Sequence, residues 1–239
     1  MRGSTATLSR RSLHIPTGLI ILTLAAVAAA ALAFVVYALW PRWPDAPPQA
    51  DAPELPIVIG DVLFRIPQAA IRRQVQRRTG TQERIELAFL WPSLEPSAPM
   101  PRANGAASAA IPRLFFTISA AASTAMTSAE RLKVIYPRYI ESSRWIGAPG
   151  LTAIAFRADT PYRGEDLFYD ARTGERFIAR CTRDTGPAPG SCLLERDVGA
   201  TIVTVRFSRA WLNDWEVLAT GIDKLIEKMQ PVARQTGSN

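Results

Sequence analysis

Histidine is almost absent from this chain of 239 residues, and the one histidine, His14, lies close to the N-terminus. The rest of the chain therefore has no imidazole, which excludes Ser-His-Asp and Cys-His catalysis and the usual zinc sites. A glycine-rich phosphate-binding loop is also missing. We expect no catalytic residue, no metal site and no cofactor, and we favour a protein that is not an enzyme.

The chain has only one long apolar run, at residues 18–40, and this run carries no charge. A helix of roughly 23 residues spans about 35 Å, enough to cross a hydrocarbon core of about 30 Å. Tyr37 and Trp40 stand at its end, as in an interfacial aromatic belt. We predict an anchor that places residues 18–40 in the lipid bilayer. The alternative is a signal peptide cleaved after Ala33, although the apolar run continues beyond that residue.

The charges that flank this run predict its orientation. Three arginines precede it and three acids follow it, namely Arg2, Arg10 and Arg11, then Asp45, Asp51 and Glu54. A basic excess marks the cytoplasmic side of a span. We therefore expect a single-pass protein of the bacterial inner membrane, with a cytoplasmic N-terminus and a periplasmic C-terminal domain.

Cysteine is nearly as scarce as histidine, with only Cys181 and Cys192. An even number of cysteines in an exported domain favours a disulfide. A bridge across the turn-rich segment between them would stabilise the domain by about 3 kcal/mol. The alternative is a redox-active pair, which normally has Cys-x-x-Cys spacing. That spacing is absent, so we predict a structural disulfide.

Lysine is rare as well, and the net charge of +7 comes mostly from arginine. A basic exported domain can lie against anionic head groups or meet an acidic partner. The alternative is a compositional bias toward arginine, alanine and proline that has no bearing on binding. We expect no nucleic acid partner, because the chain has no recognition motif for one.

These features divide the chain into five expected parts. They are a cytoplasmic stub (1–15), a transmembrane anchor (16–40), a proline-rich linker (41–56), an exported α+β domain (57–231) and a disordered tail (232–239).

Short apolar segments separated by turn residues dominate the exported domain and predict strands. The expected strands are 57–60, 62–66, 83–91, 113–119, 151–157, 166–169, 176–182, 192–196 and 201–207. In 83–91 the residues Ile85, Leu87 and Phe89 share one side. A long irregular loop is expected at 92–112, which contains several prolines.

Three helices are expected in the same domain. One covers 68–78, and one follows a capping box of Thr127 and Glu130 and continues to about residue 140, with Pro137 bending or ending it. The third follows Ser208, and its apolar residues form one stripe: Trp211, Trp215, Leu218, Ile222, Leu225 and Met229. The predicted fold class is α+β, with an N-terminal transmembrane helix and then one domain. Its mostly antiparallel sheet carries the C-terminal amphipathic helix.

Four arginines of the first helix, Arg72, Arg73, Arg77 and Arg78, are candidate binding residues for lipid head groups or an acidic protein. The alternative is the solvated face of a helix that packs through its apolar residues, Ile71 and Val75.

Carboxylates cluster in 159–170, where Glu165 and Asp166 are candidate binding residues beside Asp159 and Asp170. Two carboxylates can serve a glycosidase or hold Ca²⁺, although the spacing is not that of a calcium loop. The alternative is a solvated loop with ion pairs to arginines 157 and 163. Four tryptophans, at 91, 145, 211 and 215, are candidates for a ligand groove, with core packing as the alternative for the last two.

The C-terminal half resembles single-pass bacterial envelope proteins that have an exported, disulfide-bonded domain and no assigned activity. The segments that carry the resemblance are 161–167, 180–181, 192–195, 206–209 and 212–215. The resemblance implies an anchored exported domain and nothing about chemistry.

Three functions are compatible with the sequence. The first is a non-enzymatic interaction module with a protein partner in the envelope, an accessory or assembly subunit of a complex. The second is an immunity-type or inhibitor protein that binds an exported toxin or hydrolase. The third is a carboxylate-dependent cell-wall enzyme. The missing catalytic groups, the tether and the long loop favour the first.

Overall fold

The computed structural model describes residues 17–39, 52–97, 112–172, 176–184, 186 and 189–231. The chain divides into two compact units, Met1–Pro44 and Asp45–Asn239. The expected stub, the expected tail, most of the expected linker and most of the proline-rich loop lie outside the described residues.

The first unit contains one helix, α1 (Thr17–Leu39), with no charged residue at either end. Its window Ile21–Ala38 has a mean hydropathy of 2.4, and none of that window is buried. Length and composition make α1 a candidate membrane span, and a signal sequence near an N-terminus has the same properties.

The second unit is built on an eight-stranded sheet whose neighbouring strands are all antiparallel, in the order β4-β5-β11-β10-β9-β8-β7-β6. In chain order these strands are β4 (Arg84–Leu90), β5 (Arg113–Ala120), β6 (Ile140–Ala148), β7 (Leu151–Phe156), β8 (Glu165–Asp170), β9 (Ile178–Thr182), β10 (Ser191–Val198) and β11 (Thr201–Ser208). A smaller sheet has the order β2-β1-β3 and consists of β1 (Glu54–Ile59), β2 (Val62–Pro67) and β3 (Gly80–Thr81).

The main core lies between the large sheet and helix α3 (Trp215–Met229). Ile85, Leu87 and Phe89 of β4 all point into this core and are buried, as their alternation predicts. On α3, Leu218 and Ile222 are also fully buried. The predicted apolar stripe is therefore the side of α3 that packs on the sheet, and the α+β fold class is confirmed.

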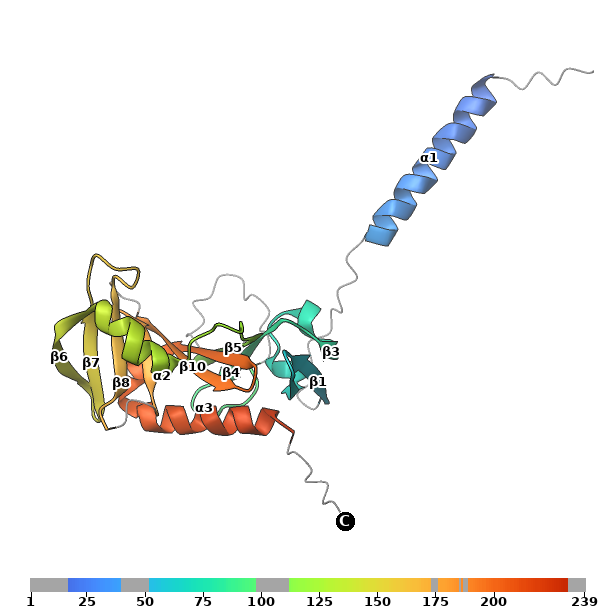
Figure 1. Cartoon of the computed structure of the whole chain (residues 1–239). Coiled ribbons are helices and arrows are strands. Elements are labelled where there is room, and N and C mark those ends of the chain that lie inside the picture. The colour runs from blue at the N-terminus through green and yellow to red at the C-terminus, as the bar shows by residue number, and fades with distance from the viewer. Residues whose placement is uncertain are drawn as a thin grey trace, which may run out of the picture. The chain divides into compact units, whose positions relative to one another are not determined.

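The opposite face of the sheet has its own small core. On β8, Phe168 belongs to the main core, whereas its neighbour Leu167 packs with Tyr136 in a second cluster. Successive side chains of a strand point to opposite faces, so residues 127–139 cover the face opposite α3. Figure 1 shows the two helices on either side of the sheet, with α2 (Ser128–Glu130) over the end that contains β8.

The predicted helix at 68–78 is wrong. The segment forms only two 3-10 turns, Gln68–Ala70 and Gln74–Gln76. Ile71 makes a bridge to Leu87 of β4, and the Arg72 amide donates to the Glu86 carbonyl at 2.9 Å. Backbone groups that bond to the sheet edge are no longer available for a helix.

The second predicted helix is shorter and less regular than expected. The capping box of Thr127 and Glu130 is present, but a π-helical turn at Arg131–Ile135 and a 3-10 turn at Tyr136–Arg138 follow α2. Pro137 lies in the last turn and has no amide hydrogen to continue a helix. The chain then enters β6, a strand that the sequence pattern did not predict.

The C-terminal helix begins later than expected. Ser208 accepts a hydrogen bond from the Ala210 amide, but it caps a 3-10 segment, Arg209–Asp214, and α3 starts at Trp215. Trp211 therefore lies ahead of α3 and only partly in the core.

Candidate functional site

The sheet face opposite α3 contains a groove of about 470 Å³. We call it the arginine groove and define it by its lining residues: Arg72, Arg84, Glu86, Phe115, Thr117, Ser119, Leu193, Thr204 and Arg206. Apart from Arg72, these residues come from β4, β5, β11 and β10, which are neighbours in the sheet.

Strand alternation explains why polar side chains line this groove. On β5, Leu114, Phe116 and Ile118 are buried in the main core, so Phe115, Thr117 and Ser119 project from the other face. The register places side chains of neighbouring strands in rows across this face. Thr117 lies opposite Glu86 on β4 and opposite Thr204 on β11, and Phe115 lies opposite Arg206.

Positive charge exceeds negative charge in the groove. Among the lining residues Glu86 is the one acid, and it forms ion pairs with Arg72 at 3.8 Å, Arg73 at 3.1 Å and Arg84 at 3.4 Å. Arg72 also lies over the Phe115 ring, 4.6 Å from its centroid. The exposed guanidinium of Arg206 pairs with no acid among the described residues. The three lining arginines thus outnumber the single carboxylate.

The structure separates the four arginines that the sequence groups together. Arg72 lines the arginine groove and Arg73 joins it through Glu86. The Arg77 guanidinium instead donates to the Ile71 carbonyl at 3.0 Å, and burial lowers the pKa of Arg77. Arg77 and Arg78 are not among the lining residues.

Arg84, Arg206 and the hydroxyl residues of the groove were missed from the sequence. Their outward position follows from strand alternation, but nothing local shows that their strands are neighbours. β4 and β5 are consecutive strands, whereas β11 joins them from about 80 residues further along the chain.

The carboxylates of β8 lie within the sheet. Asp166 is 3% exposed and accepts ion pairs from Arg183 Nε at 2.8 Å and Arg209 Nη2 at 2.7 Å. Its neighbour Glu165 is on the opposite face and pairs with Arg180 at 2.9 Å. The solvated-loop interpretation is therefore wrong for these two acids, and a binding role for them stays a prediction. The solvated-loop interpretation is correct for Asp159, which is exposed and whose Oδ1 lies 3.5 Å from Arg157 Nε.

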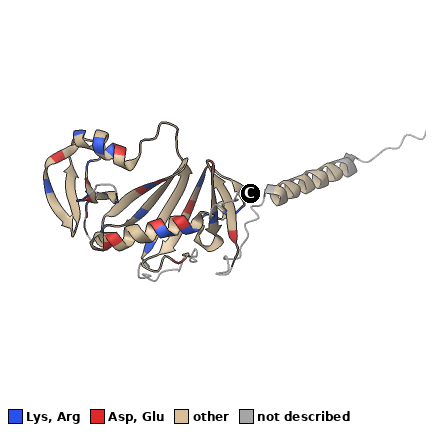
Figure 2. Cartoon of the chain, turned by 60° about the horizontal axis from the view of Figure 1, so that its bottom comes forward, with Lys and Arg blue, Asp and Glu red and all other residues tan. Residues whose placement is uncertain are grey.

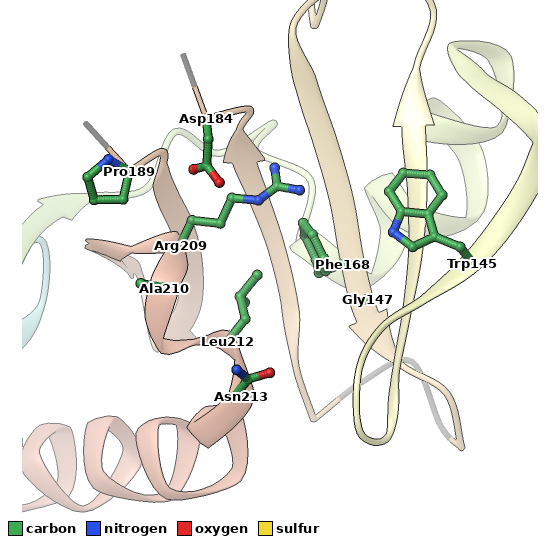
Figure 3. Close-up of a pocket in the computed structure, with 9 residues that line it drawn as sticks. All are labelled: Trp145, Gly147, Phe168, Asp184, Pro189, Arg209, Ala210, Leu212 and Asn213. Carbon is green, nitrogen blue, oxygen red and sulfur yellow. The ribbon is translucent and has the colours of Figure 1, made fainter. Parts of the chain in front are cut away.

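A second hollow, of about 230 Å³, lies between β6 and the 3-10 segment that precedes α3 (Figure 3). Trp145 forms one wall and is 41% exposed, while Arg209 on the other side lies over the Phe168 ring at 4.9 Å. We call it the Trp145 pocket. Its one arginine is paired with Asp166, and its lining also includes an acid, Asp184, which accepts a hydrogen bond from the Gly190 amide at 2.6 Å. The pocket therefore has no excess positive charge.

The four tryptophans do not form one groove. Trp91 stacks on Trp211 with ring centroids 5.5 Å apart, and Trp145 lines its own pocket. Trp215 is buried in the main core, and its indole N–H donates to the Pro149 carbonyl at 2.8 Å.

Cys181 and Cys192 form a disulfide between directly opposed positions of β9 and β10. Both are fully buried in the main core, so the predicted disulfide is present.

Among the described residues, no group of three histidine, cysteine, aspartate or glutamate side chains is placed to hold a metal ion.

No model of a known protein family matches this sequence, and no curated protein sequence matches it. Two solved structures match the chain in a comparison of structures. One is an immunity protein of the Stenotrophomonas maltophilia type IV secretion system, with a TM-score of 0.54 and 16% identity. The match covers 75% of this chain and 94% of that protein. At this identity the likeness shows a shared fold.

The other is the iron-regulated outer membrane lipoprotein FrpD of Neisseria meningitidis. Its TM-score is 0.44 at 13% identity, and the match covers 77% of this chain and 95% of that protein.

Proposed function

We propose that this chain is a membrane-anchored periplasmic module that binds another protein through the arginine groove and has no enzymatic activity. The observation that carries the proposal is the unequal cover of the sheet. One face lies under α3. Among the residues that the structure describes, the other face is covered at the end near β8 and carries a charged groove across four strands.

The outer side of α3 is a weaker candidate surface. The outer side of α3 carries acids and lysines together, which Figure 2 shows as alternating colours along the helix. Opposite charges close together neutralise one another, so this side has little net attraction for a charged partner. The arginine groove combines a recessed shape with an excess of one sign.

The anchor and the compartment are part of the proposal. α1 crosses the inner membrane once with its N-terminus in the cytoplasm, and residues 41–56 link it to a periplasmic domain at 57–231. The disulfide supports this placement, because such bonds persist in oxidising compartments. Alkaline phosphatase fused after Asn239 tests it, since that enzyme is active only when exported. We expect an active fusion in carbonate-washed membranes; an inactive fusion, or one released by carbonate, would refute the anchored orientation.

Position-specific crosslinking tests the binding surface. A photoreactive amino acid replaces Thr117 in the groove of the full chain, in its native membrane. The control replaces Lys224, which is exposed on α3. We expect a discrete protein adduct from position 117 and none of the same mass from position 224. Adducts from position 224 alone, or from neither, would overturn the proposal.

A second candidate function is immunity against an exported toxin. The fold match supports it, because it covers nearly the whole of a type IV secretion immunity protein. Cells that lack this chain would then be inhibited on contact with their parent strain, and the full chain would restore protection. Equal growth of both strains in mixed culture counts against this candidate and leaves the general binding module standing.

A carboxylate-dependent cell-wall enzyme is not proposed. Glu165 and Asp166 lie on opposite faces of β8, and each is held by arginine. Two carboxylates in this arrangement do not face a common substrate, as glycoside hydrolysis requires.

A further inference from the structure

We propose that the arginine groove binds an extended acidic segment of the partner protein, in which aspartate or glutamate side chains project toward the sheet. This inference rests on the proposed function and names the chemistry that the groove selects. Three observations lead to it: the charge balance, the hydroxyl groups of the floor and the distance between the arginines.

The charge balance requires a ligand with more than one negative charge. Glu86 is only 15% exposed and already receives ion pairs from three arginines, so it cannot neutralise each of them fully. Arg206 adds a further positive charge on β11, without an acid partner among the described residues. Guanidinium groups bind carboxylates in a planar, two-pronged geometry, and at least two carboxylates are needed here.

The floor of the groove supplies hydroxyl groups between these charges. Thr117 and Thr204 are directly opposed on β5 and β11, and Ser119 lies opposite Arg84. A hydroxyl group both donates and accepts hydrogen bonds, so it can bind a carboxylate or a peptide backbone. The two apolar lining residues are partly covered, because Arg72 lies over Phe115 and Leu193 is half-buried.

The spacing of the arginines indicates an extended ligand. Ser119 is opposite Arg84, and Phe115 is opposite Arg206, four residues away along β5. Strand geometry therefore separates Arg84 and Arg206 by about 13 Å parallel to the strands and about 10 Å perpendicular to them. An extended peptide of about five residues covers such a distance, whereas a single carboxylate or phosphate reaches one arginine.

A protein segment fits this site better than a lipid surface does. Membrane-binding surfaces combine protruding basic residues with exposed apolar side chains that enter the bilayer. The groove is recessed and charged, and its apolar residues are partly covered. We therefore commit to a peptide, and lipid binding is an outcome of the test.

Fluorescence anisotropy with the full chain in phosphatidylcholine nanodiscs tests the inference. The probe is a labelled peptide of alternating aspartate and threonine, and the matched control peptide has asparagine in place of aspartate. Arg206→Gln removes a groove charge, and Arg65→Gln removes an exposed charge on β2, outside the groove. Thermal melts of both variants check that they remain folded.

We expect the acidic peptide to bind at least about tenfold more tightly than the asparagine peptide. Arg206→Gln should weaken binding of the acidic peptide about tenfold, as the loss of a charged hydrogen bond implies. Arg65→Gln should change the affinity for this peptide less than about twofold. Equal binding of the two peptides, equal effects of the two variants, or no binding would overturn the inference. So would binding only to vesicles of equal parts phosphatidylcholine and phosphatidylglycerol.

These outcomes are separable from the test of the proposed function. If the groove crosslinks a protein from position 117 but does not prefer the acidic peptide, the partner chemistry is wrong and the binding module stands. If position 117 gives no adduct, the proposed function itself fails.

Discussion

The buried carboxylate of Asp166 gives the sharpest prediction about stability. Its side chain is 4% exposed and lies between Arg183 Nε at 2.8 Å and Arg209 Nη2 at 2.7 Å. Asp166→Asn keeps the shape of the side chain and removes its charge. We expect the variant to fold and to be measurably less stable, because two guanidinium groups lose their shared counter-ion.

The magnitude follows from how far each arginine is buried. Removing one partner of a fully buried ion pair costs about 3–5 kcal/mol. Arg209 is 19% exposed, but Arg183 is 44% exposed, so water screens part of its charge. Arg209 also keeps its hydrogen bond to the Thr182 carbonyl. We therefore expect a loss of about 2–3 kcal/mol in the free energy of unfolding.

Urea unfolding of the full chain in detergent micelles, followed by tryptophan fluorescence, measures this loss. A slope of about 2 kcal/mol/M converts it to a midpoint lower by about 1 M urea. The matched control is Asp159→Asn, which makes the same change at a carboxylate that is 78% exposed. It should cost less than about 1 kcal/mol. Equal midpoint shifts in the two variants would refute the reasoning.

Three further predictions concern the same domain. Gly147→Ala places a Cβ 2.5 Å from a ring carbon of buried Phe168. The free energy of unfolding, measured in urea titrations, should therefore fall by about 1–3 kcal/mol. Replacing Cys181 and Cys192 together by alanine should cost about 3 kcal/mol, because the disulfide closes a loop of sequence separation 11. Hydrogen bonds from Thr127 lower the pKa of Glu130; its stabilisation is complete above about pH 4.5 and is lost as the pH falls through the lowered pKa. Unfolding midpoints across this acidic range should therefore depend less on pH in Glu130→Gln.

Each of these predictions has its own control. For the glycine, an unchanged midpoint would mean that the Phe168 ring can move aside. For the disulfide, a reductant should lower the stability of the unmodified chain as the double substitution does, and thiols that react before reduction would contradict the bond. For the capping box, Glu141→Gln removes an exposed carboxylate on β6; an identical pH profile in both glutamine variants would count against the Thr127 interaction.

Elements with a strong local pattern were predicted well. β4 and α3 each bury one side, so their apolar residues recur at the period of a strand or a helix. The capping box was found because its two partners are three residues apart. β6 was missed because it is an edge strand with mostly exposed residues, and no buried side imposes an alternation on it.

The arginine-rich segment shows how a local pattern fails. Residues 68–78 have apolar and basic residues at helical spacing, yet Ile71 is buried and Val75 is 60% exposed. The sheet edge of β4 offers the backbone better partners than a helix would. Because the segment follows that edge, Arg72 and Arg73 form ion pairs with Glu86, while Arg77 donates a hydrogen bond to the Ile71 carbonyl within the segment.

The sequence by itself determined the properties that depend on composition and short-range order. A charge-free apolar run, two cysteines on predicted strands and a helix with one apolar stripe required no knowledge of distant contacts. Only the tertiary structure decided which charges meet. The arginine groove exists because β11 joins β5 from far along the chain, and the buried carboxylate of Asp166 has its two partners, Arg183 and Arg209, at other places in the sequence. Strand order sets these contacts, and residues distant in sequence decide strand order.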